Sequence, residues 1–436
     1  KDIYKHACLY CMNNLSKQNY TMRKLLLFAV FTLSASVAFA GGYRVALQGQ
    51  KALAMGHAGV AVINSSESVF FNPAGLVFLE DKLSITAGVT GVFSNISYQN
   101  TVTGDYAESD SPMGTPLYFY ASYKANDWLS VGLGVYTPYG SEVKYEKGWV
   151  GSHLVNSIKL QAIYIQPTIS VKLSDMVSIG GGPIYATGSV NFDRSLNRTL
   201  TDLEGNRSTV EVDAKGVNNW GWVASAMFNF TENLHLGATY RSEIILDTDD
   251  GDATFSNIPK SPLTPFEDSS IKAGLPMPAE LAIGLSYDFD KLTVAFDYNR
   301  AFWSAYESLD IEFENPNIPD SFNARNYKNS SVYRFGVQYD VSSMFTLRAG
   351  YYFDETPVRD GYFAPETPRN DSNNFTAGLT VNISDNLQID AAFLYSHFKE
   401  VNASYDYYFE DGVAVPFKGT YKTNAFVPGL GLTYKL

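Results

Sequence analysis

Hydrophobic and polar residues alternate along most of the chain from residue 83 onward. One clear example has these side chains on a single face: Leu281, Ile283, Leu285, Tyr287 and Phe289. The same period recurs over 345–353 and 375–383. A period of two residues is typical of a β-strand with one apolar face. Several of these segments exceed ten residues, which suits tilted strands that cross a membrane.

Short polar turns and long polar loops separate these segments in strict alternation. The short turns are 125–127, 174–175, 231–233, 289–290, 340–343 and 384–386. Asn, Asp and Ser suit tight turns because their side chains satisfy nearby backbone groups. The repeating unit is therefore strand, short turn, strand, long loop, which is the pattern of an up-and-down sheet.

The turns and the alternation together predict fourteen antiparallel strands. Their expected positions are 83–98, 114–124, 129–145, 155–172, 177–195, 207–230, 234–248, 279–289, 291–313, 327–340, 344–356, 372–384, 387–401 and 421–436. An even number places both termini on the short-turn, periplasmic side. We therefore expect an all-β fold, a transmembrane antiparallel β-barrel over residues 81–436. A large soluble β-sandwich also alternates and is the alternative.

The N-terminus carries the pattern of an export signal. Met22-Arg23-Lys24 gives a basic start, 25–37 is a short apolar run, and Ala38-Phe39-Ala40 fits a cleavage site. We predict a signal peptide at 22–40 and interpret residues 1–21 as an artefact upstream of the true start. The only two cysteines, Cys8 and Cys11, lie in that upstream stretch. No metal, disulfide or thiol chemistry is therefore expected in the mature chain.

Composition narrows the class further. Only 18% of the residues are charged and 14% are aromatic, which suits strands with one lipid-facing side better than a soluble helical protein. The formal net charge of −13 argues against nucleic acid as a partner. Beyond Ala40 the chain has no apolar run of about 18 residues that could form a spanning helix. An exported chain of this kind is either soluble or a barrel.

Residues 41–80 precede the first predicted strand and do not alternate. The segment 50–61 is rich in Gly and Ala, and 64–76 contains Asn72-Pro73-Ala74. Small residues allow close packing, so we expect this segment to plug the barrel lumen as a hatch. A soluble periplasmic extension is the alternative.

The hatch segment resembles that of the FadL-type outer-membrane transport family, which has a G-x-A-x-A-G-x-A run followed by S-x-x-F-x-N-P-A-G. The similar residues here are the Gly/Ala-rich run 50–61 and the segment 64–76. Further similarity follows in order along the chain. The matching segments are 131–140, 148–151, 275–278, 297–309 and 347–358. An NPA tripeptide alone is weak, but the ordered set covers nearly the whole mature chain. The final strand, which ends at Leu436, is similar to an outer-membrane assembly signal, although a terminal Phe is commoner.

The resemblance implies a monomer in the bacterial outer membrane that passively transports long-chain fatty acids or other hydrophobic molecules, including aromatic hydrocarbons. It implies capture at outer loops, binding in the lumen, and lateral release into the membrane through a kink in strand three. Pro138, Tyr139 and Gly140 are the expected kink, because Pro lacks an N–H and Gly tolerates bending. Pro138 could equally be an ordinary strand end. We expect Asn72, Pro73 and Ala74 to lie against the inner wall near strand three, where the Asn72 side chain can hydrogen-bond backbone groups left free by the kink and Pro73 fixes the turn.

Ligand contacts are expected from a loop and from lumen cations. The predicted loop 249–278 is rich in apolar residues, and those expected to capture ligand are Phe255, Ile258, Leu263 and Phe266. Packing of the loop on itself is the alternative. Arg348, Arg334 and Lys159 are expected to face the lumen, where they could bind a carboxylate or form salt bridges with Asp297 or Asp390.

Other functions fit less well. The five His are scattered, and no G-x-S-x-G or metal-spaced His cluster occurs, so neither an enzyme nor a cofactor or metal site is expected. A general diffusion porin would need an open lumen. A surface adhesin or receptor role for the loops remains compatible with transport.

Overall fold

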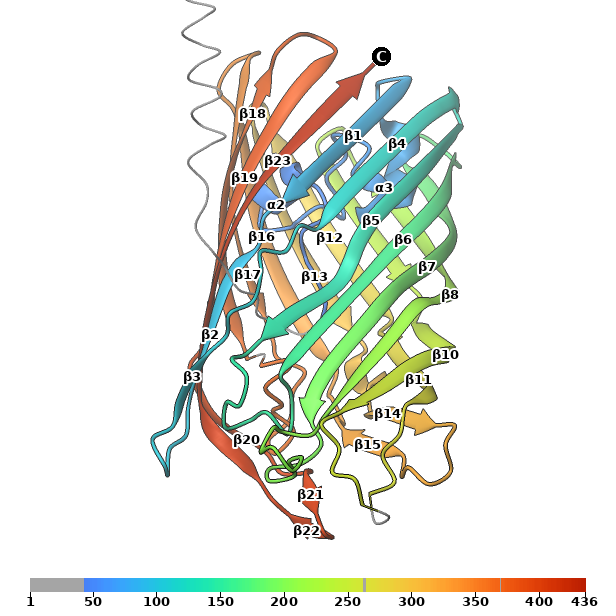
Figure 1. Cartoon of the computed structure of the whole chain (residues 1–436). Helices are drawn as coiled ribbons and strands as arrows, with labels where there is room; N and C mark the ends of the chain where they lie inside the picture. Colours follow the sequence, from blue (N-terminus) through green and yellow to red (C-terminus); the bar gives the residue numbers. More distant parts are fainter. Residues whose placement is uncertain (1–42, 262–263, 369) are drawn as a thin grey trace, which may run out of the picture. The chain divides into compact units, whose positions relative to one another are not determined.

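The computed structural model describes residues 43–261, 264–368 and 370–436, and these form a closed antiparallel β-barrel of fourteen strands (Figure 1). Closure comes from pairing of the first strand with the last, for example Ala87 with Leu432. The barrel strands, some in two parts, are β1 (Leu83–Thr90) with β2 (Phe93–Gln99), β4 (Leu117–Asn126), β5 (Leu129–Lys144), β6 (Ser157–Lys172), β7 (Val177–Ser195), β8 (Thr209–Asn229), β9 (Leu234–Arg241) with β10 (Ile244–Ser256), β11 (Ser269–Met277) with β12 (Glu280–Phe289), β13 (Leu292–Ala301) with β14 (Ser308–Phe313), β15 (Ser321–Ala324) with β16 (Ser330–Asp340), β17 (Phe345–Asp354), β18 (Ser372–Asn382), β19 (Leu387–Phe398) with β20 (Val401–Tyr405), and β23 (Phe417–Lys435). Small additions are β3 (Tyr106–Glu108), β21 (Phe409–Glu410) and β22 (Val413–Ala414).

This architecture confirms the predicted fold class. The predicted upstream segment 1–21 and signal peptide 22–40 lie outside the described residues. Among the described residues, no helix has the length and apolar character needed to cross a membrane.

Two stretches differ from the predicted strands. The strand expected over 291–313 is interrupted by the short helix η2 (Trp303–Ala305). The expected loop 249–278 is largely strand, because β10 continues to Ser256 and pairs with β11. This part of β10 was missed because Asp and Gly are poor strand formers and interrupt the apolar alternation.

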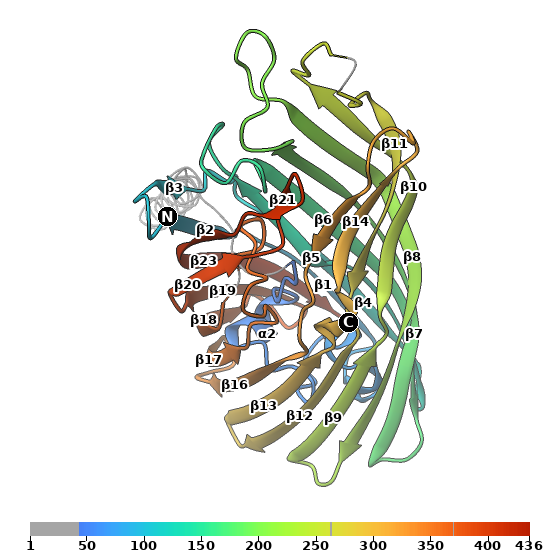
Figure 2. The same cartoon turned by 90° about the horizontal axis from the view of Figure 1, so that it is seen from below.

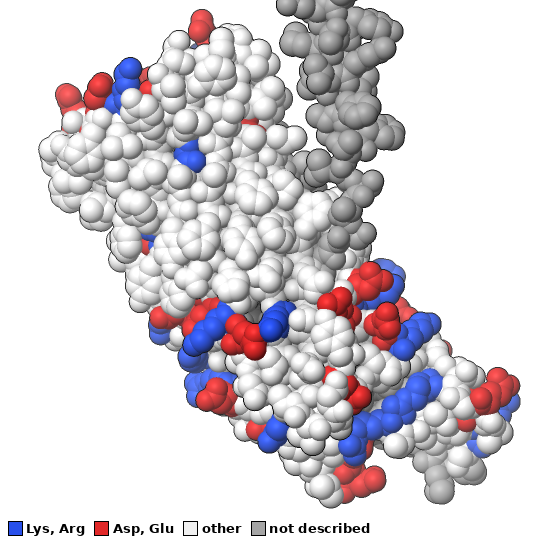
Figure 3. Space-filling model, turned by 90° about the vertical axis from the view of Figure 1, so that its left-hand side faces the viewer, with Lys and Arg blue, Asp and Glu red and all other residues white. Residues whose placement is uncertain are grey.

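The outer surface of β23 defines the membrane-facing zone. Between Phe426 and the C-terminus, the exposed outward side chains of β23 are apolar. On the other side of Phe426, toward the outer loops, the outward side chains are polar or charged and include Asn424, Lys422 and Lys418. Ten residues of a strand tilted by about 45° rise roughly 25 Å, which matches the apolar band of an outer-membrane barrel. Phe426 ends a row of paired outward aromatics: Tyr351, Phe375, Tyr395 and Phe426. Figure 3 shows the resulting white band above a belt of charged side chains.

The segment 43–80 lies inside the lumen, as Figure 2 shows from the extracellular end. It contains α2 (Gln50–Ala54), α3 (Ser68–Phe71) and the short helix η1 (Pro73–Phe78), whose residues are almost all buried. Glycines of the wall make room for its backbone. A Cβ atom on Gly350 would lie 2.0 Å from the backbone nitrogen of Gly56, and one on Gly336 would lie 2.2 Å from the carbonyl oxygen of Met55.

Candidate functional site

Strand β5 carries a β-bulge at the predicted kink. Tyr136 pairs with Tyr164 of β6 and Tyr139 pairs with Ala162, so Thr137 and Pro138 together oppose the single residue Ile163. A bulge bends a strand and interrupts its ladder. Pro138 fits there because it has no N–H to donate.

On the extracellular side of the bulge, β5 is no longer paired with β4, the second strand of the barrel. The register of β4 with β5 ends at Tyr136, where Tyr118 is the partner, and the described residues show no later β4–β5 pair. The hatch takes over this edge: Gly140 N–H donates to the Tyr43 carbonyl (2.7 Å) and Val45 N–H donates to the Pro138 carbonyl (2.7 Å). The backbone that the bulge frees is therefore satisfied by residues 43–45, which act as a very short strand.

A charged cluster fixes this hatch segment to the wall. Arg44 donates to Asn299 (2.9 Å) and forms ion pairs with Asp354 (3.3 Å) and Glu280 (3.6 Å). The Tyr139 hydroxyl also contacts Glu280 (3.2 Å). The two β-bridge partners, Arg44 and Tyr139, are thus both tied to the same carboxylate.

Asn72, Pro73 and Ala74 lie against the inner wall, as predicted, but the prediction that they lie near strand three is wrong. The Asn72 amide donates to the carbonyls of Val60 (2.9 Å) and Ala226 (3.1 Å), and the latter is on β8. The Ala74 carbonyl accepts from Ser178 on β7 (2.6 Å). Asn72 also accepts from Ala74 N–H, so it caps η1, and Pro73 occupies the first turn. The tripeptide therefore anchors the hatch to β6–β8 through hydrogen bonds. The backbone of Tyr43 and Val45 makes the hydrogen bonds to β5.

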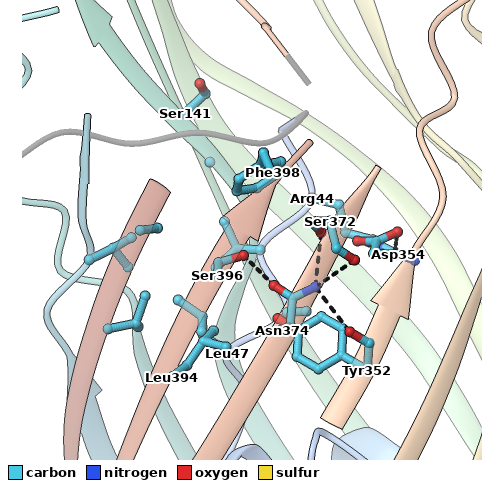
Figure 4. Close-up of a pocket in the computed structure, with 16 residues that line it drawn as sticks. Arg44, Leu47, Ser141, Tyr352, Asp354, Ser372, Asn374, Leu394, Ser396 and Phe398 are labelled. Atoms are coloured by element: carbon cyan, nitrogen blue, oxygen red, sulfur yellow. Dashed lines mark hydrogen bonds and ion pairs between the residues drawn. The ribbon is translucent and has the colours of Figure 1, made fainter. Parts of the chain in front are cut away.

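A pocket lies beside the bulge, between the start of the hatch and strands β17–β19 and β23 (Figure 4). Residues of β17, β18 and β19 form a hydrogen-bonded group around Asn374. Asn374 accepts from Ser396 and donates to Ser372 (2.9 Å) and to the Tyr352 carbonyl (3.2 Å). Ser141 of β5 lies at the opposite side of this pocket.

A second cavity, on the other side of Ser141 and Tyr43, is almost entirely apolar. The side chains that line it include Ile158, Leu160, Phe192, Val212, Leu246 and Leu275. The ring of Tyr43 is held between Trp303 (4.9 Å between centroids) and Tyr306 (5.5 Å), both edge-on. Its hydroxyl donates to the Pro276 carbonyl (2.7 Å). Tyr43 is therefore a fixed wall at the end of the apolar cavity nearest the bulge.

The outer loops form a wide mouth that adjoins the apolar cavity. Phe255 stacks on Phe266 (5.5 Å) and lies 5.9 Å from Phe313, and all three line the mouth. Ile258 is partly buried and does not line it, and Leu263 lies outside the described residues. Glu366 lines both the mouth and the apolar cavity, so the two spaces meet there.

Three arginines lie at or beside this junction, and two of them are neutralised. Arg325 forms an ion pair with Glu366, and Arg198 forms one with Glu410. Burial alone would lower the pKa of the Arg325 guanidinium, but the neighbouring Glu366 carboxylate raises that pKa above its ordinary value. These two guanidinium groups already have an acidic partner.

Arg194 differs from both. It donates only to the His153 carbonyl (3.4 Å) and the Ser321 hydroxyl (3.2 Å), and no carboxylate of the described residues lies within 4 Å. Burial lowers the pKa of His153 to about 4, so its imidazole is neutral at pH 7 and adds no charge. Arg194 was missed in the sequence, although it shares the inward parity of Phe192 on β7.

The three predicted lumen cations do not reach the apolar cavity. Arg334 donates to the His57 carbonyl (3.4 Å) against the hatch, and Arg348 donates to Gln338 (2.8 Å) on the periplasmic side. Neither forms an ion pair with Asp297 or Asp390 in the described structure. Lys159 points outward, with 59% of its side chain exposed, and pairs with Glu142 (3.5 Å). The hatch occupies the half of the lumen where Arg334 and Arg348 lie, which separates them from ligand space.

The hairpin β21–β22 is held at the mouth by the Arg198–Glu410 pair. Burial would raise the pKa of Glu410, but hydrogen bonds from Arg198 hold it at about 2, below the ordinary value of 4.5. The pair therefore stabilises the docked hairpin above about pH 4.5, and this contribution is lost as the pH falls toward 2. A spin label on Val413→Cys should gain mobility over that range, and Glu410→Gln should show the mobile spectrum already at pH 7. A label that stays immobile in both conditions contradicts this role.

The comparisons with known proteins agree with this geometry. Residues 31–436 match the family described as outer membrane protein transport protein (OMPP1/FadL/TodX). The chain belongs to this family. It is therefore an outer-membrane protein of a family of transport proteins, and the predicted recognition and location are confirmed.

Relatives match over most of their length. An outer membrane protein of Neisseria meningitidis serogroup B is 27% identical, with 95% of this chain and 98% of the relative covered. The long-chain fatty acid transport protein of Escherichia coli is 22% identical, covering 88% and 93%. The solved structure of a Pseudomonas aeruginosa FadL homologue has a TM-score of 0.77 at 20% identity, covering 90% and 99%. The Pseudomonas putida toluene transporter TodX has a TM-score of 0.67 at 17% identity, covering 91% and 99%. The two structures support the fold.

In the described part of the chain, no group of three His, Cys, Asp or Glu side chains is placed to hold a metal ion.

Proposed function

We propose that this protein carries hydrophobic compounds passively across the outer membrane, and that long-chain fatty acids are its ligands. The observation that carries the proposal is a chain of adjoining spaces. The mouth and the apolar cavity share Glu366, and the apolar cavity and the pocket beside the bulge share Ser141. Together they lead from the outer loops to the one place where strand three leaves strand two.

The apolar cavity supplies the driving force for uptake from water. Each buried CH₂ of an acyl chain contributes about 0.8 kcal/mol, so a long chain gains far more than a small polar solute. The hatch fills the lumen below, which disfavours a general diffusion porin. The related proteins bear names for two ligand classes, a fatty acid and toluene, so the cavity alone does not choose between them.

Arg194 favours the fatty acid. A partly buried guanidinium without a carboxylate partner is costly, whereas a bound carboxylate would provide two charge-assisted hydrogen bonds. Arg194 lies in the mouth and shares the inward face of Phe192, which lines the apolar cavity. A fatty acid would place its carboxylate at Arg194 and its chain among the apolar side chains. Toluene has no group for this position.

The edge of β5 that faces β4 is a suitable place for ligand to leave sideways into the membrane. Unpaired backbone in contact with lipid costs several kcal/mol per group, so an open gap would not persist without a substitute partner. Residues 43–45 supply that partner. We propose that ligand leaves into the membrane when this segment moves off Pro138–Gly140, and that no external energy source is needed.

The test is a comparison of Arg194→Gln with Lys215→Gln, which removes the same charge from an exposed cation that is paired with Asp213 and lies outside the mouth and the apolar cavity. Palmitate binding to the purified barrel should weaken about tenfold in Arg194→Gln and little in Lys215→Gln. Toluene binding should be the same in both. Equal palmitate affinity in the two variants would remove the fatty-acid assignment and leave a transporter of neutral hydrocarbons.

A further inference from the structure

The outward face of β23 changes character beyond the aromatic row that ends at Phe426. The next outward residues are Asn424, Lys422, Thr420 and Lys418. Lys422 pairs with Glu400 (2.9 Å). Figure 3 shows this belt of charged side chains below the apolar band. The belt therefore begins at the height of the head groups of the outer leaflet and continues outward from there.

A hollow opens on this flank at the far end of the belt, where Lys418 lies. Three cations line it, Lys328, Arg359 and Lys418, each from a different part of the chain. Neutral donors stand beside them, including Asn370 and Asn402. The only acidic side chain among the described residues that line the hollow is Asp360.

The loop that carries Arg359 is held in place by backbone pairing along β20. Phe363 N–H donates to the Ser404 carbonyl (3.0 Å), and Asp406 N–H donates to the Gly361 carbonyl (2.9 Å). Ser404 pairs with Lys418 across the sheet, and Lys328 N–H donates to the Pro357 carbonyl (2.9 Å). The three cations therefore converge on a hollow whose walls are ordered.

In the described structure, these three cations have no acidic partner, unlike several other exposed cations of the barrel. Lys159, Lys215 and Lys272 each lie within 4 Å of a carboxylate. No carboxylate of the described residues lies that close to the charged groups of Lys328, Arg359 or Lys418. The chain has 45 acidic and 32 basic residues, so three unpaired cations in one hollow run against its overall balance.

We propose that this hollow binds the phosphate groups of an outer-leaflet lipid. Phosphate oxygens accept charge-assisted hydrogen bonds from Arg and Lys, and basic pockets at head-group height are suited to anionic lipids. The hollow lies on the outer flank of the barrel, at the far end of the charged belt that begins beyond the aromatic row, and this position favours a membrane lipid over a soluble anion. The site lies outside the transport path, so it is independent of the proposed ligand.

The experiment measures binding to the purified full-length barrel in neutral detergent. The probes are bisphosphorylated lipid A, the same lipid without its phosphates, and inorganic phosphate. The test variant is Lys328→Gln, Arg359→Gln, Lys418→Gln. The control variant, Lys159→Gln, Lys215→Gln, Lys272→Gln, loses the same charge from ion-paired positions. Wild type should bind the phosphorylated lipid, and the test variant should lose between about tenfold and a hundredfold in affinity.

The control variant should stay within about twofold of wild type, and palmitate binding should be unchanged in both variants. Equal losses in the two variants would show a diffuse charge effect and overturn the site. Equal binding of the phosphate-free lipid would show that the acyl chains, rather than the phosphates, are recognised. Inorganic phosphate that binds as tightly as the lipid would replace the membrane assignment with a soluble anion.

Discussion

Locking the hatch to the bulged strand should abolish uptake and leave ligand binding intact. Arg44 and Tyr139 are β-bridge partners flanked by the two hydrogen bonds of residues 43–45 with 138–140. Such a non-hydrogen-bonded pair has its Cα atoms about 4.5 Å apart, within the range of a disulfide. The described residues contain no other cysteine. In Arg44→Cys, Tyr139→Cys the segment that must move is then covalently fixed.

The oxidised double variant should take up palmitate at least about tenfold more slowly than the same protein after reduction, because only the oxidised form holds the exit closed. The reduced form is the matched control, since both forms lack Arg44 and Tyr139. Palmitate binding in detergent should be equal in the two forms. Full oxidation without any loss of uptake would contradict release past this segment.

A second variant keeps the idea testable if the cysteine pair prevents assembly. Pro138→Val with Gly140→Thr supplies residues that pair well in a strand and resist bending. This variant should stay heat-modifiable on gels and show reduced uptake. Normal uptake with strands β4 and β5 paired beyond Tyr136 would favour passage past a displaced hatch into the periplasm.

The barrel was predictable because each strand has one side in lipid. Apolar residues must therefore recur at every second position of the strand, and the regularly spaced turns give the number of strands. The rule fails beyond the membrane, where both sides of a strand meet water or loop. There β10 continues through Asp249 and Asp250 and pairs with β11, although no apolar face marks it.

The site was less predictable, for three separate reasons. Residues 43–45 form a strand too short to have a period, and it exists only because the bulge leaves an edge for it. Asn72-Pro73-Ala74 was recognisable as a motif, but its location depends on the wall. A Cβ on Gly180 of β7 would lie 2.5 Å from the Ala74 nitrogen, so the glycine there admits the hatch. Arg194 could have been found from its parity with Phe192, whereas its lack of a carboxylate partner appears only in three dimensions.

Adding one methyl group to the wall at Gly350 should unseat the hatch. The Cβ of Gly350→Ala would lie 2.0 Å from the Gly56 nitrogen, and backbone there cannot rotate away as a side chain could. Gly56 has a φ of +64°, which favours glycine, and its N–H donates to the Thr376 hydroxyl (2.8 Å). Both its backbone conformation and its contact with the wall therefore restrict its position. Overpacking against a fixed backbone costs about 3 kcal/mol, which shifts the seated hatch toward its unseated state by over a hundredfold.

The measurement is protease cleavage within residues 43–80 of the assembled barrel, together with the sensitivity of cells to a large hydrophilic antibiotic. Both should rise in Gly350→Ala because the lumen is then open part of the time. Gly274→Ala is the matched control, since its added Cβ meets Ile245 at an ordinary 3.4 Å. The barrel itself should stay folded in both variants, because its strand pairing does not pass through the hatch. A hatch that remains resistant in Gly350→Ala would mean that the wall yields instead, and that the lumen glycines do not determine how the hatch is seated.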